Sequence, residues 1–287
     1  MSGGRTFVNH AKTAALMGGL MAVFVLVGSM WGTQGMVTAL IFGGVMNVIA
    51  WAFSDKIAIA AMQGREVTPQ GGPRVPGAEG LYEMVDRLRQ RAGLPMPRVY
   101  VCPHDAPNAF ATGRSPRAAA VAVTQGLLRT MNREELEGVV AHELAHIKNR
   151  DTLISCIAAT MAGVLAFLAQ WGFFLGGRRE GGNPLVMIVV VIVGAVGAAL
   201  IKAAISRSRE FIADADGAAI AGSPHGLASA LAKLDALSRR VPLVQPNPAQ
   251  NNLFIVEPLA GGMGGLTNLF ATHPPTERRI AALLGAR

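Results

Sequence analysis

The segment HELAH, residues 142–146, carries two histidines four residues apart with a glutamate directly after the first. In a helix, residues four apart lie on one face, so the imidazoles of His142 and His146 can reach one metal ion. Glu143 is then placed to take a proton from a water that the metal polarises. The pattern predicts metal-assisted hydrolysis. The alternative is a polar helix face whose histidines are hydrated.

A third metal ligand has to come from elsewhere, because a catalytic zinc keeps three protein ligands and one open position. The segment SRSREFIADADGA, residues 206–218, offers Glu210 and, four residues later, Asp214. We expect Glu210 to complete the zinc site and Asp214 to accept a hydrogen bond from the far nitrogen of a ligand histidine. The alternative is that both acids balance Arg207 and Arg209 on a solvated helix.

The composition indicates a membrane protein. Hydrophobic residues make up 51% of the 287 residues and charged residues 15%, whereas a soluble domain carries about 25% charged residues. The net charge of +8 comes without a basic patch interleaved with aromatics, so no nucleic-acid binding is expected. The two cysteines, Cys102 and Cys156, show no disulfide or zinc-ligand pattern. We therefore expect the basic excess to orient the chain in a lipid bilayer.

Four apolar runs reach the length of about 20 residues that crossing a bilayer requires. They lie at about 13–31, 35–53, 152–176 and 185–206. They predict two helical hairpins. Lysines and arginines gather at the span ends next to the polar regions, whereas Arg178 and Arg179 in the loop 177–184 run against that trend. By the positive-inside rule, both termini and the polar regions are expected in the cytoplasm.

The hairpins divide the chain into alternating membrane and polar segments. The four segments are an N-terminal membrane hairpin (1–53), the first part of a catalytic domain (54–151), a second membrane hairpin (152–206) and the second part of the catalytic domain (207–287). The zinc helix is expected to run straight into the third span, and the helix of Glu210 to leave the fourth. One hairpin would then position two parts of one metal site at the membrane surface.

Local patterns predict the elements of the polar region. They are a Gly/Pro linker (64–77), an amphipathic helix (79–92) and short strands at 99–102, 108–111 and 118–124. Asn132 and Glu135 form a capping box that opens the HELAH helix. The predicted fold is therefore mainly α: a polytopic membrane protein with a catalytic domain that contains a small β-sheet.

Four segments together resemble the HtpX-type membrane zinc metalloproteases, relatives of the mitochondrial and prenyl-protein membrane zinc proteases. The segments are PNAFATG (107–113), VVAHELAHIKNRD (139–151), SRSREFIADADGA (206–218) and ATHPPTERRI (271–280). The resemblance covers nearly the whole chain and implies a zincin-like (gluzincin) α+β catalytic domain. It implies one zinc ion on His142, His146 and Glu210, with Glu143 as general base and acid and Asp214 as the partner of a ligand histidine.

The resemblance implies further roles near the metal. A substrate peptide would pair by main-chain hydrogen bonds with an edge strand. The residues of that strand are Asn108, Ala109, Phe110 and Ala111. His273 would donate to the oxyanion that forms during attack, and Arg279 would assist. The alternatives are an ordinary sheet strand, a residue that begins the last helix for His273, and a surface salt bridge for Arg279.

The same resemblance implies quality-control proteolysis, linked to stress, at the cytoplasmic face of the bacterial inner membrane. The expected partners are misfolded or damaged membrane proteins, unfolded polypeptides and the lipid bilayer. Two other functions stay open: a processing protease for one membrane-bound or lipidated substrate, and a non-enzymatic transporter or scaffold whose metal is structural or absent. Neither pattern nor resemblance indicates an oligomeric state.

Overall fold

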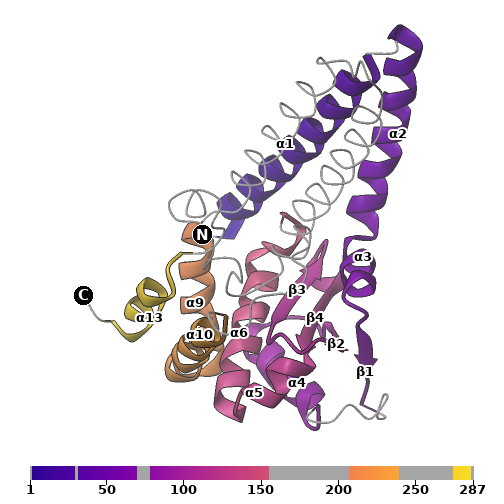
Figure 1. Ribbon diagram of the computed structural model, residues 1–287. Coiled ribbons are helices and arrows are strands. Elements are labelled where there is room, and N and C mark those ends of the chain that lie inside the picture. The colour runs from indigo at the N-terminus through magenta and orange to yellow at the C-terminus, as the bar shows by residue number, and fades with distance from the viewer. Residues whose placement is uncertain (1, 30–31, 70–77, 155–206, 239–273, 286–287) are drawn as a thin grey trace, which may run out of the picture.

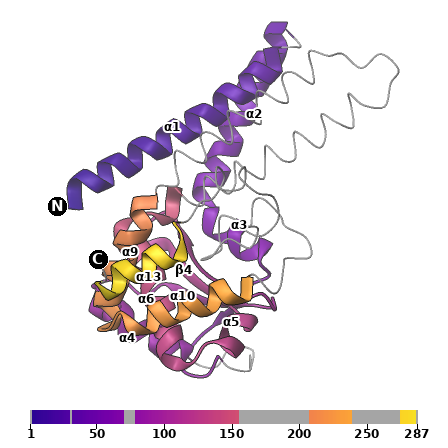
Figure 2. The same cartoon turned by 60° about the vertical axis from the view of Figure 1, so that its left-hand side comes forward.

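The computed structural model describes residues 2–29, 32–69, 78–154, 207–238 and 274–285 (Figure 1). The predicted span at 185–206, nearly all of the predicted span at 152–176, and His273 lie outside these residues. The described part consists of a long N-terminal helical hairpin and a domain in which helices surround a small sheet. Figures 1 and 2 show the hairpin projecting well beyond this domain.

The N-terminal hairpin consists of α1 (Ser2–Ser29) and α2 (Gly32–Ala52). The two helices pack along their length. The side-chain amide of Asn47 donates to the carbonyl oxygen of Met17 at 3.0 Å, and the rings of Phe24 and Phe42 meet edge to face with centroids 5.6 Å apart. The first predicted hairpin is therefore present in the structure.

The outer surface of this hairpin is apolar. Val37, Leu40, Ile41, Val45 and Val48 of α2 are all more than half exposed. Among the described residues, one helical stretch, 32–49, is long and apolar enough to cross a membrane, and a shorter apolar stretch, 13–26, lies in α1. Of the four predicted spans, the described residues therefore supply one that meets the length criterion. A contiguous apolar surface of this kind indicates contact with lipid or another apolar partner.

The sheet of the domain has four strands in the order β1–β2–β4–β3. The strands are β1 (Arg65–Val67), β2 (Arg98–Cys102), β3 (Ala109–Gly113) and β4 (Ala119–Thr124). The central pair β2–β4 is parallel, and the outer strands β1 and β3 run antiparallel to their neighbours. The three predicted strands are thus confirmed, and the mixed sheet within a mainly helical chain agrees with the predicted fold class.

The predicted linker at 64–77 is wrong in its first part. Arg65 to Val67 form β1 and pair with Val99 to Val101 of β2. The Gly/Pro-rich composition that suggested a linker belongs to the residues that follow, whereas Arg65, Glu66 and Val67 have no glycine or proline that would prevent strand pairing.

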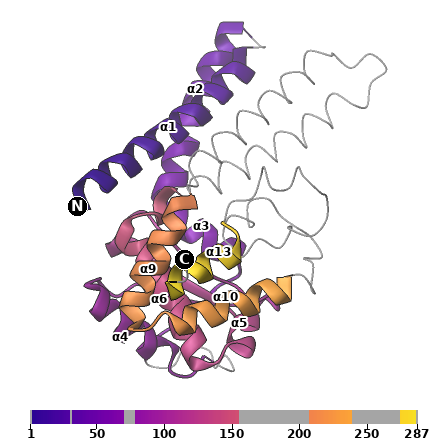
Figure 3. The same ribbon diagram turned by 90° about the vertical axis from the view of Figure 1, so that its left-hand side faces the viewer.

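Helices cover the sheet and form most of the domain. They are α3 (Ser54–Ala61), α4 (Leu81–Ala92), α5 (Gln125–Thr130), α6 (Arg133–Asn149), α9 (Arg207–Ala221), α10 (His225–Ser238) and α13 (Thr276–Leu284). Figure 1 shows α6 between the strands and the pair α9 and α10, and Figure 3 shows α9, α10 and α13 together on one side of the domain. The HELAH helix is therefore the central helix of the core.

The predicted capping box begins α6. The side chain of Asn132 accepts from the backbone N–H of Glu135, and the carboxylate of Glu135 accepts from the backbone N–H of Asn132, both at 2.9 Å. Glu135 also accepts hydrogen bonds from Ser229 and Lys233 of α10, at 2.8 and 2.6 Å. One buried carboxylate thus caps the central helix and fixes α10 against it.

The helix does not run straight into the third span, and that prediction is wrong. α6 ends at Asn149, because Arg150 takes a left-handed conformation with φ 59° and ψ 36°. The backbone N–H of Asp151 then turns back to the carbonyl oxygen of His146 at 3.0 Å. The next helical residues begin at Thr152, so a turn separates the metal-site helix from the predicted span.

Candidate metal centre

Three side chains from two helices, two of them buried and one partly buried, converge within the domain. His142 and His146 come from α6 and Glu210 from the first turn of α9. The Nε2 atoms of the two histidines are 3.2 Å apart, and each lies 3.7 Å from a carboxylate oxygen of Glu210. Two imidazoles and one carboxylate therefore present a nitrogen, a nitrogen and an oxygen to one point, as the sequence analysis expected.

These separations fit a zinc ion. Zinc binds histidine nitrogen and carboxylate oxygen at about 2.0–2.2 Å, and two ligands at a tetrahedral angle are then about 3.3 Å apart. The three observed separations, 3.2, 3.7 and 3.7 Å, lie close to that value. Among the described residues, this is the group of histidine, cysteine and acidic side chains whose potential ligand atoms lie within 4.8 Å of one another. The donor set is also the one found in catalytic zinc sites with two histidines and a glutamate.

A tight contact between α6 and α9 brings the three ligands together. A Cβ atom added to Gly217 of α9 would lie 2.9 Å from the Cα atom and 3.0 Å from the backbone nitrogen of His142. Only glycine allows the two backbones to approach this closely. Glu210 lies about two turns before Gly217 on the same helix, so this approach sets the position from which its carboxylate reaches the histidines.

Asp214 holds His142 in the orientation that metal binding requires. Its Oδ1 atom lies 3.0 Å from Nδ1 of His142, and Nε2 of the same ring faces Glu210 and His146. Both side chains are buried, with 2% of each exposed. The structure thus places Asp214 where the sequence analysis expected it, and the alternative of a solvated acidic helix face is wrong for Glu210 and Asp214.

Arg279 of α13 braces Asp214 from the other side. Its Nε and Nη2 atoms donate to the two carboxylate oxygens at 2.8 and 2.7 Å, and Nη2 also lies 3.5 Å from Oε2 of Glu210. The side chain is 1% exposed, so the alternative of a surface salt bridge is wrong. Burial alone would raise the pKa of Asp214, but the hydrogen bonds from Arg279 and His142 outweigh it and lower this pKa to about 2.

A second carboxylate, which the sequence analysis missed, contacts the other ligand histidine. Oδ2 of Asp151 lies 3.3 Å from Nδ1 of His146, and Arg209 of α9 lies 3.8 Å from the other oxygen of Asp151. Burial opposes a charge on His146, yet the hydrogen bond to Asp151 and the carboxylates of Glu210 and Glu143 outweigh it and raise the pKa of His146 to about 9. The surroundings of His146 therefore favour a cation.

The charges around the histidines have the sign and size that suit a divalent cation. Carboxylates outnumber guanidinium groups by two when both histidines are neutral. The carboxylates are those of Glu143, Asp151, Glu210 and Asp214, and the guanidinium groups are those of Arg209 and Arg279. A buried excess of two negative charges is costly without a compensating ion. A bound divalent metal would balance it.

Glu143 lies beside the ligands on α6 and is also buried, with 4% exposed. It follows His142 by one residue, so its side chain points about 100° away from the ligand face of the helix. Its negative charge acts on both His146 and Arg279. This places a carboxylate next to the metal position without making it a ligand, as a general base requires.

The predicted substrate strand is β3, at the end of the described sheet order. Ala109, Phe110 and Ala111 belong to it, and Asn108 precedes it, with its backbone N–H donating to Oγ1 of Thr124 at 2.9 Å. All four residues are buried. The position at the sheet edge agrees with the prediction, and the pairing with a substrate stays a prediction, as does the role of His273, which lies outside the described residues.

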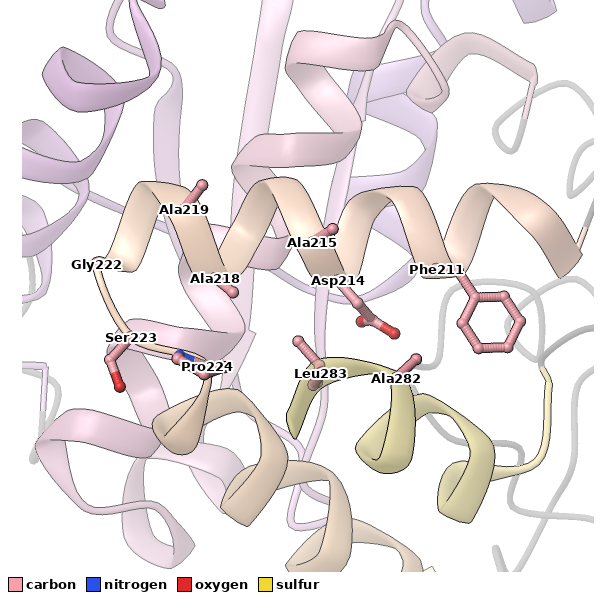
Figure 4. Close-up of a pocket in the computed structure, with 10 residues that line it drawn as sticks. All are labelled: Phe211, Asp214, Ala215, Ala218, Ala219, Gly222, Ser223, Pro224, Ala282 and Leu283. Atoms are coloured by element: carbon pink, nitrogen blue, oxygen red, sulfur yellow. The ribbon is translucent and has the colours of Figure 1, made fainter. Parts of the chain in front are cut away.

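A separate pocket of about 500 Å³ lies on the side of α9 that faces α13. Figure 4 shows Asp214 of α9 pointing toward Ala282 and Leu283 of α13. The other lining residues are mostly small, among them Ala215, Ala218 and Ala219, and none is a metal ligand. The pocket therefore backs onto the carboxylate that orients His142 and is not the metal site itself.

Comparison with known proteins agrees with this arrangement. The profile of Peptidase family M48 matches residues 78–287, which include all the site residues from Asn108 onward. The chain belongs to peptidase family M48. This membership confirms the predicted class, a metalloprotease.

Individual relatives match the chain over almost its whole length. The protease HtpX homolog of Desulforapulum autotrophicum is 51% identical over 284 residues, which cover 96% of this chain and 89% of the relative. The protease HtpX homolog of Gemmatimonas aurantiaca is 49% identical over 281 residues, which cover 96% of this chain and 98% of the relative. The predicted resemblance to the HtpX-type proteases is therefore confirmed.

A solved structure shares the fold. The crystal structure of S. mikatae Ste24p matches with a TM-score of 0.50 at 16% sequence identity. The match covers 98% of this chain and 66% of that one, so this chain spans about two thirds of the length of the solved protein. At this level of identity the similarity concerns the fold alone.

Proposed function

We propose that this protein is a membrane-bound zinc endopeptidase that cleaves misfolded or damaged membrane proteins at the cytoplasmic face of the bacterial inner membrane. The observation that carries the proposal is the convergence of His142, His146 and Glu210 within 4.8 Å, with Glu143 beside them on the same helix. The names of the relatives, protease HtpX homologs, support the same activity.

The donor set favours zinc over the hard cations. Calcium and magnesium prefer six or more oxygen ligands, whereas two imidazoles and one carboxylate match the ligands of catalytic zinc. A zinc ion held by these residues would supply a Lewis acid that lowers the pKa of a water molecule to about 7 and polarises the scissile carbonyl. The chain's own residues then have to move the protons and hold the substrate.

Glu143 is the residue that moves the proton. Its carboxylate takes one proton from the attacking water as the new carbon–oxygen bond forms at the scissile carbonyl. The same proton passes to the amide nitrogen as the carbon–nitrogen bond breaks, which leaves a carboxylic acid and an amine. Nδ1 of His142 faces Asp214 and Nδ1 of His146 faces Asp151, so the Nε2 atom of each ring is directed toward the metal position.

The substrate would lie along β3. Main-chain pairing with a strand edge recognises an extended peptide with little dependence on its side chains. This suits a protease that acts on many unfolded segments. His273 would donate to the oxyanion, in the role that the family resemblance implies.

The apolar hairpin that precedes the domain of the site supports the choice of substrate. α2 presents half-exposed valine, leucine and isoleucine side chains, and its last turn continues through Phe53 into α3 of the catalytic domain. Loops and ends of damaged membrane proteins emerge at this level of a bilayer. The positive-inside distribution of lysine and arginine supports a cytoplasmic catalytic domain with both termini on the same side.

The proposal is tested by metal-dependent cleavage with the full chain in detergent. Purified protein is stripped with a chelator, divided, and supplied with zinc, magnesium or buffer before unfolded casein is added. Cleavage that returns with zinc and not with magnesium supports the proposal. Zinc-dependent cleavage of one membrane-anchored or lipidated peptide, with casein left intact, would favour a selective processing protease. Tightly bound zinc without cleavage of either substrate would favour a structural metal.

A further inference from the structure

The turn that ends α6 has a conformation that helix propensity does not explain. Arg150 is one of two described non-glycine residues with a positive φ, at 59°. This left-handed conformation costs a residue with a Cβ atom about 1–2 kcal/mol. Two backbone hydrogen bonds hold it, from Arg150 N to Ile147 O at 3.2 Å and from Asp151 N to His146 O at 3.0 Å. A strained turn directly after metal-ligating residues suggests a role at the site.

The consequence of this turn is that Asp151 folds back under His146. Its backbone N–H bonds to the carbonyl oxygen of His146, and its carboxylate oxygen Oδ2 lies 3.3 Å from Nδ1 of the same residue. The carboxyl group is buried, with 7% exposed. Asp151 therefore contacts one histidine with both its main chain and its side chain, and it contacts the ring at the nitrogen that faces away from the metal.

Arg209 connects this carboxylate to the helix of the third ligand. Its Nη1 atom lies 3.8 Å from Oδ1 of Asp151, and its side chain is 13% exposed. Arg209 directly precedes Glu210 in α9. The contact thus joins the end of α6, next to His146, to the turn of α9 that supplies Glu210.

The two sides of the metal site are built alike. On one side, His142 contacts Asp214, which Arg279 braces. On the other side, a second histidine, carboxylate and arginine stand in the same order, namely His146, Asp151 and Arg209. In metal sites, a carboxylate on the far ring nitrogen fixes the tautomer and the orientation of the ligand histidine, and its loss typically weakens metal binding 10–100-fold.

We propose that Asp151 is a positioning residue for the metal ligand His146, and that the left-handed turn at Arg150 exists to place it. This inference rests on the proposed metal site. It assigns Asp151, in the NRD sequence at residues 149–151, a function in metal binding: its carboxylate at Nδ1 orients the ring of His146 so that Nε2 faces the metal position, and Arg209 lies between this carboxylate and the helix of Glu210.

The experiment measures metal affinity of the full chain in detergent by competition with a chromophoric chelator. The variants are Asp151→Asn and Asp151→Ala, with Asp214→Asn as comparator and the exposed α6 residue Lys148→Ala as control. We expect Asp151→Asn and Asp151→Ala to weaken zinc binding about 10–100-fold, as Asp214→Asn does, and Lys148→Ala to bind like the parent. Cobalt-loaded Asp151→Asn should also show a changed visible ligand-field spectrum, which a loss of stability alone would not produce.

Substitutions at Arg150 distinguish the effect of the backbone conformation on zinc binding from the effect of the arginine side chain. Glycine adopts the left-handed conformation without strain, whereas a β-branched residue resists it. Arg150→Gly should therefore keep the parent's zinc affinity and cobalt spectrum, and Arg150→Val should lose affinity as Asp151→Ala does. Equal losses in both variants would contradict the role of the turn.

The result that overturns the inference is parental zinc affinity and an unchanged cobalt spectrum in folded Asp151→Asn and Asp151→Ala. That outcome leaves the proposed function intact if the parent still binds zinc and cleaves casein. A parent that binds neither zinc nor cobalt would overturn both proposals. If the parent binds zinc but does not cleave casein, the proposed protease function is overturned. The zinc affinities of the variants would still test the positioning role of Asp151.

Discussion

Arg279 is the largest side chain that lies fully buried among the described residues, and replacing it should disturb both the fold and the metal site. Its guanidinium group forms two hydrogen bonds with Asp214, at 2.8 and 2.7 Å. In Arg279→Met, most of the side-chain volume remains, but the carboxylate of Asp214 is left buried with one partner, His142, in place of two. Because this carboxylate orients His142, the change should reach the metal ligand.

The size of the effect follows from the burial of the pair. Removing one partner of a buried ion pair costs about 3–5 kcal/mol, because it leaves an uncompensated charge in the interior. For a domain of about 150–250 residues, each kcal/mol lowers the melting temperature by about 2–4 °C. We therefore expect the metal-free Arg279→Met protein to melt about 6–20 °C below the parent. Its zinc affinity should fall about 10–100-fold, because His142 loses its fixed orientation.

Scanning calorimetry of the metal-free protein in detergent is the suitable assay. All three tryptophans, Trp31, Trp51 and Trp171, lie in or beside the predicted membrane hairpins, so tryptophan fluorescence would report mainly on the hairpins and not on the surroundings of Arg279. The matched control is Arg278→Met in the same helix, because Arg278 is exposed and its loss should shift the melting temperature little.

A double-mutant cycle tests the reasoning. Asp214→Asn alone leaves Arg279 buried without its ion partner and should also destabilise the protein. The double variant with Arg279→Met carries neither buried charge, so its loss should be smaller than the sum of the single losses by about 1–3 kcal/mol. Additive losses, or a melting temperature of Arg279→Met within error of the Arg278→Met control, would refute the account of a buried pair that orients His142.

Two further predictions concern the packing and the capping of α6. Gly217→Ala adds a methyl group 2.9 Å from Cα of His142, so we expect α9 to shift away from α6. Chelator competition should then show zinc binding weakened by about tenfold or more. Gly18→Ala is the control, because its added methyl group meets no atom within 4 Å, and it should bind zinc like the parent. Burial opposes ionisation of Glu135, but hydrogen bonds, first that from Lys233, outweigh it and hold the pKa of Glu135 below its ordinary value. The stabilisation by this carboxylate is therefore present above about pH 4.5 and is lost as the pH falls through the lowered pKa. Glu135→Gln should lower the free energy of unfolding near pH 7 by about 1–3 kcal/mol, seen as a lower melting temperature, and should flatten the decline of the melting temperature below about pH 4.5. Equal melting temperatures of parent and Glu135→Gln near pH 7 would contradict this reading.

The metal ligands can be predicted from the sequence because metal binding requires particular residue types at particular spacings. His142 and His146 are recognisable from their separation of four residues, and Glu135 from its position three residues after a cap. The roles of Glu210 and Asp214 could not be assigned from their spacing alone, because a pair of acidic residues on a helix has many explanations. Their assignment depended on the need for a third ligand and on the resemblance of the segments around them.

The features that the sequence analysis missed depend on contacts between distant residues or on an unusual backbone. Asp151 lies five residues after His146, a spacing that places it on another face of a continuous helix. Only the left-handed turn at Arg150 brings Asp151 back to His146. The sequence does not predict that turn, because the residue in this conformation is usually glycine and here it is arginine. The burial of Arg279 depends on the packing of α13 against α9, which local patterns do not contain.

The short strand β1 shows the same limit in the fold. Its three residues pair with β2 across more than thirty residues of sequence, and their composition is that of an exposed segment. By contrast, β2 and β4 could be predicted from their apolar runs. Both strands are buried along almost their whole length, and burial is what requires an apolar sequence. Local pattern therefore specifies the interior strands, and tertiary pairing decides the edge.

The most direct test of the central claim is Glu143→Gln, with bound zinc and casein cleavage measured on the same detergent-purified sample. Glutamine keeps the size of the side chain and cannot accept the proton of the attacking water, and Glu143 is not expected to be a metal ligand. The account predicts zinc binding equal to that of the parent and cleavage reduced by about 10²–10⁴-fold. Parental cleavage by Glu143→Gln with its zinc bound would contradict the proposal that Glu143 moves the proton at this site.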